Sequence, residues 1–215
     1  MEQNVSMKIN ELPSPTWNWL KVNETPIKWS NKIEPCEIAA EGDAVATETE
    51  QLSDIETGAG READAIFATE NTAKYQILAD NAGQDKTVRL HISGKKDAHT
   101  AGCVEIVAKE NSTLTVVMDS RVAPDATKEE DSTAEASLAV RVRMKVESGA
   151  SVRLVQVQMP QEHETLLSDI GGNLIGEGAK VEYIQLFLGK GNLYSGCRMD
   201  LNLSLIHISE PTRLR

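Results

Sequence analysis

Apolar and polar residues alternate along most of the chain beyond residue 73. Successive side chains of a β-strand point to opposite faces, so a period of two predicts strands with one buried face. No long amphipathic helix interrupts the series, and we therefore predict a mainly β core over 74–202. The predicted strands are KYQIL (74–78), KTVRLHI (86–92), CVEIVA (103–108), TLTVVM (113–118), LAVRVRMKV (138–146), SVRLVQVQM (151–159) and KVEYIQLFL (180–188).

A weak internal repeat accompanies the alternation. Asparagine and glycine tolerate the positive φ of a tight turn, and each repeat places one of them just before a strand. Such corner-then-strand units predict coils that stack on one another, as in a β-helix or solenoid. An antiparallel sandwich is the alternative, although the Asn-Gly and Asp-Gly dipeptides typical of its hairpins do not occur. The matched units are Asn111-Ser112-Thr113-Leu114, Gly149-Ala150-Ser151-Val152 and Gly178-Ala179-Lys180-Val181.

Two segments of different composition precede this core. Residues 1–33 contain all three tryptophans, and we expect a short helix or an extended segment whose indoles pack on the main body. Stacking of these indoles on a ligand is the alternative. Residues 34–73 carry eleven acidic side chains against the single base Arg61. Because like charges repel and few large apolar groups are present, we expect a solvated linker that is loosely ordered or partly helical.

Charge and cysteine content limit the class of protein. The 215 residues carry a net charge of -11, which argues against binding nucleic acid, since that requires basic groups to neutralise phosphates. No apolar run approaches the ~20 residues that cross a bilayer, and the N-terminus lacks the pattern of a secretion signal. An odd number of scattered cysteines predicts free thiols and a cytoplasmic protein. These are Cys36, Cys103 and Cys197.

The sequence offers little chemistry of its own. The stretch LGKGN (188–192) lacks the upstream glycine and the following Ser or Thr of a phosphate-binding loop. No Cys-x-x-Cys pair occurs, so we expect Cys103 and Cys197 to be small buried thiols rather than metal ligands. We assign no catalytic, cofactor-binding or metal-binding residue and predict that the chain is not an enzyme. The histidines that we considered and place in surface loops are His91, His99 and His163.

Four segments, taken in order, resemble the SufD branch of the SufB/SufD iron–sulfur cluster assembly family. The resemblance implies a right-handed parallel β-helix with a short helical N-terminal segment, and a non-catalytic scaffold role. It also implies a SufB-like subunit and a SufC-like ATPase as partners. The cluster would be handled by the full complex and not bound by this chain alone. The segments are LPSPTWNWLKVNE (12–24), IVAKENSTLTVVMD (106–119), ESGASVRLVQVQM (147–159) and DIGGNLIGEGAKVEYIQLFLGKGNLYSGCRMDL (169–201).

The end of the chain departs from that family. Members continue with further coils and a helical region, whereas LSLIHISEPTR (203–213) resembles the translation of a sequencing adapter. We therefore expect residues 203–215 to be a non-native tail on a C-terminally truncated fragment, and we carry over no cluster ligand. The alternative functions are a β-helix carbohydrate-active enzyme and a passive binding solenoid. The enzyme would need grouped carboxylates on a strand face, where these strands offer VRVRMK (140–145) and QVQM (156–159).

Overall fold

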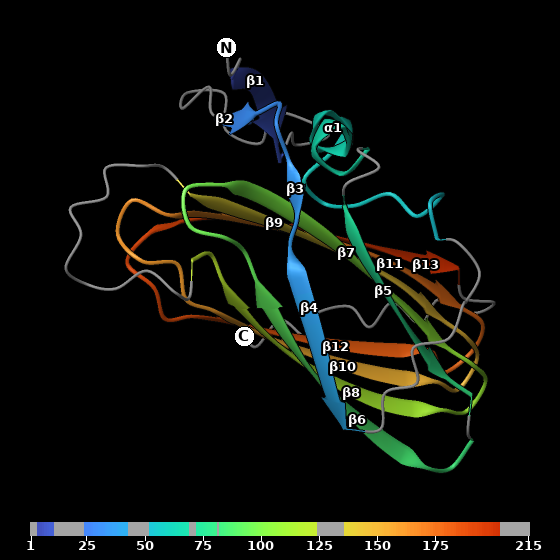
Figure 1. Ribbon diagram of the computed structural model, residues 1–215. Coiled ribbons are helices and arrows are strands. Elements are labelled where there is room, and N and C mark those ends of the chain that lie inside the picture. Colours follow the sequence, from blue (N-terminus) through green and yellow to red (C-terminus); the bar gives the residue numbers. More distant parts are fainter. Residues whose placement is uncertain are drawn as a thin grey trace, which may run out of the picture.

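The computed structural model describes residues 4–10, 24–42, 52–68, 72–80, 82–123 and 136–202. The chain forms two large β-sheets that face each other (Figure 1). The five-stranded sheet has the order β12-β10-β8-β6-β4. Its strands are β4 (Glu37–Gly42), β6 (Asp85–Ser93), β8 (Thr113–Arg121), β10 (Ser151–Gln158) and β12 (Lys180–Phe187).

The six-stranded sheet has the order β13-β11-β9-β7-β3, with a further strand, β5, also paired to β7. Smaller elements cover its outer face: an antiparallel pair of strands and a short helical turn (Figure 1). The strands of the six-stranded sheet are β3 (Glu34–Pro35), β5 (Ala73–Ala79), β7 (His99–Ala108), β9 (Ser137–Val146), β11 (Thr165–Ile175) and β13 (Asn192–Asn202). The covering elements are β1 (Asn4–Ile9), β2 (Thr25–Ser30), the 3₁₀ turn η1 (Arg61–Ala63) and α1 (Asp64–Phe67).

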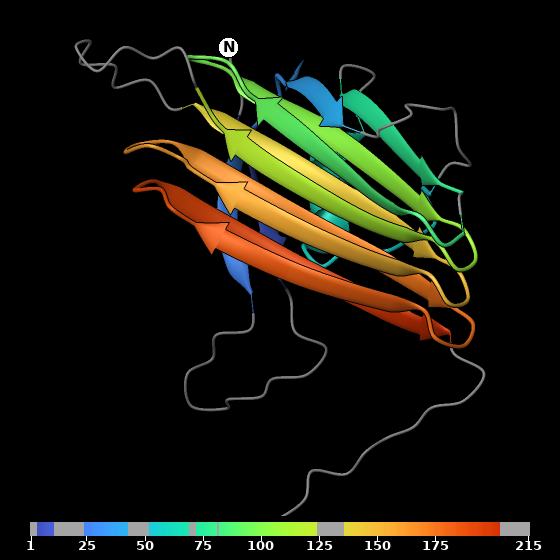
Figure 2. The ribbon, with the colours of Figure 1, turned by 90° about the horizontal axis from the view of Figure 1, so that it is seen from below.

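From β6 to β13 the chain alternates between the two sheets, one strand at a time. Within each sheet the neighbours from β6 or β7 onward are parallel, so each pair of strands lies beside the preceding pair (Figure 2). A mainly β fold with parallel sheets is therefore confirmed, and the antiparallel sandwich is excluded for this region. The strand β4 differs, because it pairs antiparallel with β6.

The internal repeat predicted the strand register. Thr113 of β8 pairs with Ser151 of β10, which in turn pairs with Lys180 of β12, as the matched units require. The corner residues Asn111, Gly149 and Gly178 have φ of 58°, 67° and 74°, which confirms the left-handed turns. Backbone hydrogen bonds link the corners too, since Asn111 N donates to Ser148 O at 3.0 Å. The sequence analysis missed a fourth corner of the same kind, at Gly83 with φ 79°.

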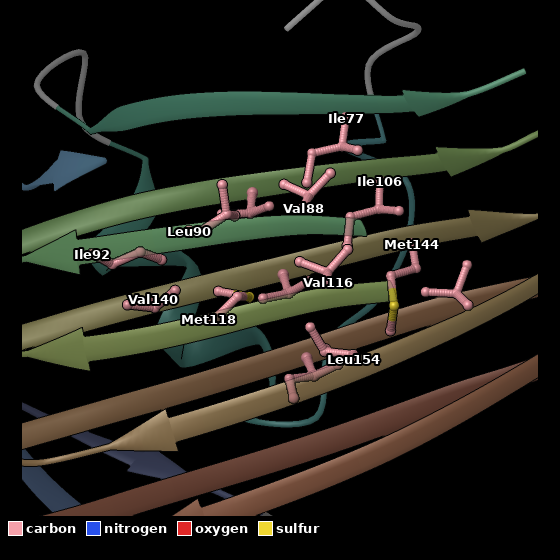
Figure 3. Close-up of a cluster of buried hydrophobic side chains, with 14 of the residues drawn as sticks. Ile77, Val88, Leu90, Ile92, Ile106, Val116, Met118, Val140, Met144 and Leu154 are labelled. Carbon is pink, nitrogen blue, oxygen red and sulfur yellow. The ribbon is translucent and has the colours of Figure 1, made fainter. Parts of the chain in front are cut away.

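Aliphatic side chains fill the space between the two sheets (Figure 3). Every second residue of each strand points inward and stacks on the residue at the same level of the neighbouring strand. Burial of one such side chain contributes about 1.5–3 kcal/mol, so this column of residues is the main source of stability. Those labelled in Figure 3 are Ile77, Val88, Leu90, Ile92, Ile106, Val116, Met118, Val140, Met144 and Leu154.

The structure corrects the helical part of the expectation for residues 1–33 and confirms that an indole packs on the main body. A helical N-terminal segment is not found in the described residues: 4–9 and 25–30 are paired strands, and the buried Trp29 packs with them on the six-stranded sheet. Trp17 and Trp19 lie outside the described residues. Residues 34–42 and 52–68 differ in part from the expected solvated linker, although η1 and α1 confirm its partly helical character. This part forms β3, β4, η1 and α1, and it buries Leu52, Ile55, Ala59, Ala63, Ile66 and Phe67.

The corner at Asn111 gives a stability test. Replacing Asn111 with Val places a β-branched residue at φ 58°, which we expect to lower the free energy of unfolding by about 1–2 kcal/mol. Asn111→Gly, the matched control at the same position, should leave stability nearly unchanged because glycine accepts this conformation. Urea unfolding followed by circular dichroism measures both. Equal stability of the Val and Gly variants would contradict the left-handed corner.

Candidate functional site

The outer face of the six-stranded sheet carries the most concentrated polar chemistry of the described residues. Parallel register aligns outward-facing side chains of neighbouring strands into rows across the sheet. Positively and negatively charged groups meet in both rows, directly beneath residues 52–68. One row runs Lys74, Cys103, Arg141, Asp169, and the next runs Gln76, Glu105, Arg143, Gly171, Arg198.

The backbone of segment 52–68 crosses this face in close contact with the backbone of the strands below it. A Cβ atom added to Gly171 would lie 2.4 Å from Glu56 O, and one added to Gly196 would lie 2.4 Å from Ala59 N. Gly58 N donates a hydrogen bond to Ile170 O at 3.0 Å. Glycine at these sheet positions leaves the space that the crossing backbone occupies, so the segment can lie flat on β11 and β13.

A buried carboxylate fixes the crossing segment. Asp169 of β11 is fully buried, and its two oxygens accept three hydrogen bonds. Thr57 Oγ1 donates to Oδ2 at 2.7 Å, Ala59 N donates to Oδ1 at 2.8 Å, and Arg141 Nε donates to Oδ2 at 2.8 Å. A charged group without partners is costly to bury, and these donors offset that cost. Asp169 thus ties the segment to both β9 and β11.

Arg141, on the neighbouring strand β9, also holds segment 52–68 to the sheet. Its side chain is 3% exposed, and Nη1 lies 2.7 Å from Asp64 Oδ1 of α1. The guanidinium carbon stands 4.1 Å from the centre of the Phe67 ring, within the range of a cation–π contact. Nη2 lies 2.8 Å from Asp169 Oδ2 but makes no hydrogen bond of acceptable angle within the described residues. One arginine therefore contacts the sheet, the helical turn and an aromatic ring at once.

Two open cavities of about 350 Å³ each lie beside segment 52–68, and Arg141 lines one of them. Both are bordered by Ser53, Asp64 and Arg143, so they are adjacent. Arg143 Nε donates to Ile55 O at 3.1 Å, and Arg198 is paired with Glu56. The first cavity is also lined by Asp54, Ile55, Glu56, Thr57, Gly60, Arg61 and Arg198, and the second by Phe67, Ala68, Lys74, Gln76, Cys103, Glu105 and Arg141.

The thiols are poorly suited to nucleophilic chemistry. Burial raises the pKa of Cys36 to about 12. Burial also raises the pKa of Cys103, against the opposing effect of Arg141 and Arg143. Cys197 is exposed as a residue, yet partial desolvation and then the Asp169 charge raise its pKa as well. Because the thiolate is the reactive form of cysteine, raised pKa values favour an inert role.

The structure separates the histidines rather than bringing them together. His91 lies in β6 and not in a loop, with Nδ1 2.5 Å from Asp119 Oδ2. His99 begins β7, where it lies beside the Trp29 ring and Nδ1 is 2.6 Å from Ser137 Oγ. The loop predicted for these two residues is therefore wrong. His163 stands in an exposed turn with φ 67°, as predicted.

Within the described ranges, no three His, Cys, Asp or Glu side chains are grouped closely enough to hold a metal ion. No helix in the same ranges is long and apolar enough to cross a membrane. Comparison with protein-family models, with curated proteins and with solved structures gave no match to this chain.

Sequence reasoning missed the Arg141–Asp169 pair. Arg141 was visible only as one of three bases that alternate with apolar residues in LAVRVRMKV (138–146). Asp169 lies in TLLSDIGGNLI (165–175), a stretch not predicted as a strand. The available signal was a lone Asp in an otherwise uncharged, largely apolar stretch, with two glycines shortly after it.

The buried ion pair gives a second prediction. Asp169→Asn removes the negative charge that Arg141 faces, and leaving one member of a buried pair unmatched costs about 3–5 kcal/mol. We expect the free energy of unfolding to fall by an amount near the lower end of that range, since the Asn side chain can keep some of the hydrogen bonds that Asp169 accepts. The exposed Asp200→Asn, which also faces an arginine, should cost less than about 1 kcal/mol. Urea denaturation measures both variants.

The double variant Arg141→Met with Asp169→Leu is the second arm of this test. Replacing both charges with apolar groups leaves no uncompensated charge, so it should be more stable than Asp169→Asn alone. If Asp169→Asn were no more harmful than Asp200→Asn, the pair would not hold segment 52–68. Limited proteolysis within 52–68 gives an independent readout of its release.

The three thiols should differ in reactivity. In the native protein at pH 8, a disulfide reagent should modify exposed Cys197 first and half-buried Cys103 more slowly. Cys36, whose pKa is near 12, should react only on unfolding. Mass spectrometry of the labelled peptides gives the order, and Cys197→Ser should abolish the fast phase. Native labelling of Cys36 at the rate of Cys197 would contradict its position in the core.

Proposed function

We propose that this chain is a non-catalytic scaffold subunit for iron–sulfur cluster assembly, of the SufB–SufC–SufD type. The observation that carries the proposal is the parallel alternation of strands between two sheets. The three resembling segments from residue 106 onward supply all or most of β8, β10, β11, β12 and β13, which belong to that arrangement. The proposal depends on those segments and on this topology.

The finer fold belongs to the same proposal. We take the two-sheet stack to be part of a right-handed parallel β-helix, as in the SufB/SufD family. The in-register corners at Asn111, Gly149 and Gly178 support coils that repeat along one axis. A scaffold needs a rigid body on which partners assemble, and rows of buried aliphatic residues between parallel strands provide one.

The polar site on the outer face fits a structural rather than a catalytic role. Arg141 and Asp169 are occupied with each other, with segment 52–68 and with Phe67. The described thiols have raised pKa values, which disfavours a thiolate nucleophile. The cluster is then cargo of the complete complex, and this chain binds none by itself. The expected partners are a SufB-like subunit and a SufC-like ATPase in the cytoplasm, with no nucleic acid or membrane.

Two other functions remain as alternatives. A carbohydrate-active enzyme would pair two carboxylates across a few ångströms of one face, one as acid and the other as base or nucleophile. On the outer face of the five-stranded sheet, Asp119 is instead bound to His91, and Glu182 to Arg153 at 2.7 Å. A passive binding solenoid would use the same coils to hold a partner without assembling a complex. Hydrolysis of a polysaccharide by the purified chain would favour the enzyme.

An independent read of the gene past codon 202 tests the proposal. We expect it to continue into further coils and a helical region, with residues 203–215 replaced by natural sequence. The product of that gene should co-purify with the SufB-like and SufC-like proteins of the same genome, and the complex should carry a cluster after reconstitution. The 215-residue chain should neither hydrolyse ATP nor retain a cluster. Absence of co-purification by the extended product, or a stable stoichiometric cluster on the 215-residue chain, would contradict the proposal.

A further inference from the structure

The second cavity on the outer face of the six-stranded sheet is lined by more charge than its own side chains neutralise. Its lining includes the bases Lys74, Arg141 and Arg143 and the acids Asp64 and Glu105. A ligand can bind only to those groups that have no partner already. The contacts of these five side chains therefore decide what the cavity can hold.

Both acids of the lining have partners. Asp64 Oδ1 lies 2.7 Å from Arg141 Nη1, so this carboxylate and this guanidinium offset each other. Glu105 Oε2 accepts a hydrogen bond from Gln76 Nε2 at 2.8 Å, and Oε1 accepts one from Leu52 N at 3.3 Å. Each oxygen of Glu105 therefore has a neutral donor, and this carboxylate has no basic partner in the described residues.

The other two bases keep charged N–H groups without a partner among the described residues. Arg143 of β9 donates from Nε to Ile55 O at 3.1 Å, a contact that holds its guanidinium at the cavity wall. Its two Nη groups make no hydrogen bond or ion pair there, and neither does the ammonium group of Lys74 on β5. Charged donors that line a cavity without an acceptor are suited to bind an anion.

Cys103 lies between these two bases. In the parallel register Lys74 is the neighbour of Cys103 on β7, which is in turn the neighbour of Arg141 on β9, two residues before Arg143. Neighbouring strands are about 4.8 Å apart, so the backbones of β5 and β9 are separated by about 10 Å, a span that two long basic side chains can close around a small anion. Burial raises the pKa of Cys103, and all three bases of the lining oppose that rise, as expected of cations beside the thiol.

We propose that this cavity binds a small phosphate-bearing anion between Arg143 and Lys74, beside the Cys103 thiol. The paired N–H groups of a guanidinium match two oxygens of a phosphate, and an ammonium adds a compact positive charge. The two unpaired bases outweigh the single carboxylate of Glu105, so a phosphate dianion meets a net positive charge. A single carboxylate group offers only two oxygens and one charge, and it satisfies one base and not both.

The size of the cavity limits the ligand. Its volume of about 350 Å³ lies near the lower end of small-molecule pockets, which range over roughly 300–1,000 Å³. Inorganic pyrophosphate or a small phosphorylated metabolite fits this volume, whereas a dinucleotide exceeds it. The inference rests on the outer face of the six-stranded sheet alone and is independent of the proposed function.

Protection of Cys103 from alkylation tests the site. In a Cys197→Ser background Cys36 is buried, so Cys103 is the thiol that the uncharged reagent N-ethylmaleimide reaches in the native protein. At constant ionic strength, inorganic pyrophosphate should slow this alkylation saturably, because the bound anion covers the thiol. Acetate at the same ionic strength should slow it much less. Absence of saturable protection at millimolar pyrophosphate, or equal protection by acetate, would overturn the proposal.

A pair of lysine variants locates the anion. Lys74→Gln removes one of the two bases and should raise the pyrophosphate concentration for half-protection at least about tenfold, the equivalent of about 1.4 kcal/mol. Lys180→Gln is the matched control, since it makes the same change of charge at an exposed lysine of β12 on the other sheet. It should leave that concentration unchanged. Equal effects of the two variants would show general charge screening and refute the site, and circular dichroism checks that both variants fold.

Discussion

In-register parallel pairing between every second strand is the constraint on which the rest of this structure depends. It aligns inward-facing aliphatic residues into continuous columns, and it aligns outward-facing polar residues into rows. A slip of one residue in any strand would exchange those two sets, exposing the column and burying the row. The left-handed corners at Asn111, Gly149 and Gly178 prevent that slip, because each starts its strand at the same level.

The rows on the outer face of the six-stranded sheet show what this alignment makes possible. Arg141 and Asp169 are neighbours only because β9 and β11 are in register. Together they bind Thr57, Ala59 and Asp64 of segment 52–68 through hydrogen bonds and an ion pair. Glycine at positions 171 and 196 opens the path for the backbone of 56–59. An acidic segment is thus folded onto the core by a few charged contacts and by the small apolar groups between them.

Alternation predicted seven strands from the sequence, and the corner repeat predicted how three of them pair. The alternation and the corner repeat are both local sequence patterns, and tertiary contacts did not change the structure that they predict. β11 was missed because Asp169, Gly171 and Gly172 disfavour a strand locally. Each has a tertiary reason: Asp169 pairs with Arg141, Gly171 lies under Glu56 O, and a Cβ on Gly172 would meet Met199 Sδ at 2.4 Å. Segment 52–68 was misjudged because its acidic charge was visible, whereas the arginines that balance it lie far away in the chain.

The central claim is the parallel, in-register stack, and nuclear magnetic resonance tests it most directly. Interstrand nuclear Overhauser effects should connect Leu114 with Val152 and Val152 with Val181 through amide and α protons, in the pattern of parallel strands. That result would establish both the direction and the register of β8, β10 and β12. Strong contacts between α protons of facing strands, which characterise antiparallel pairing, or a set of contacts shifted by one residue, would contradict the account.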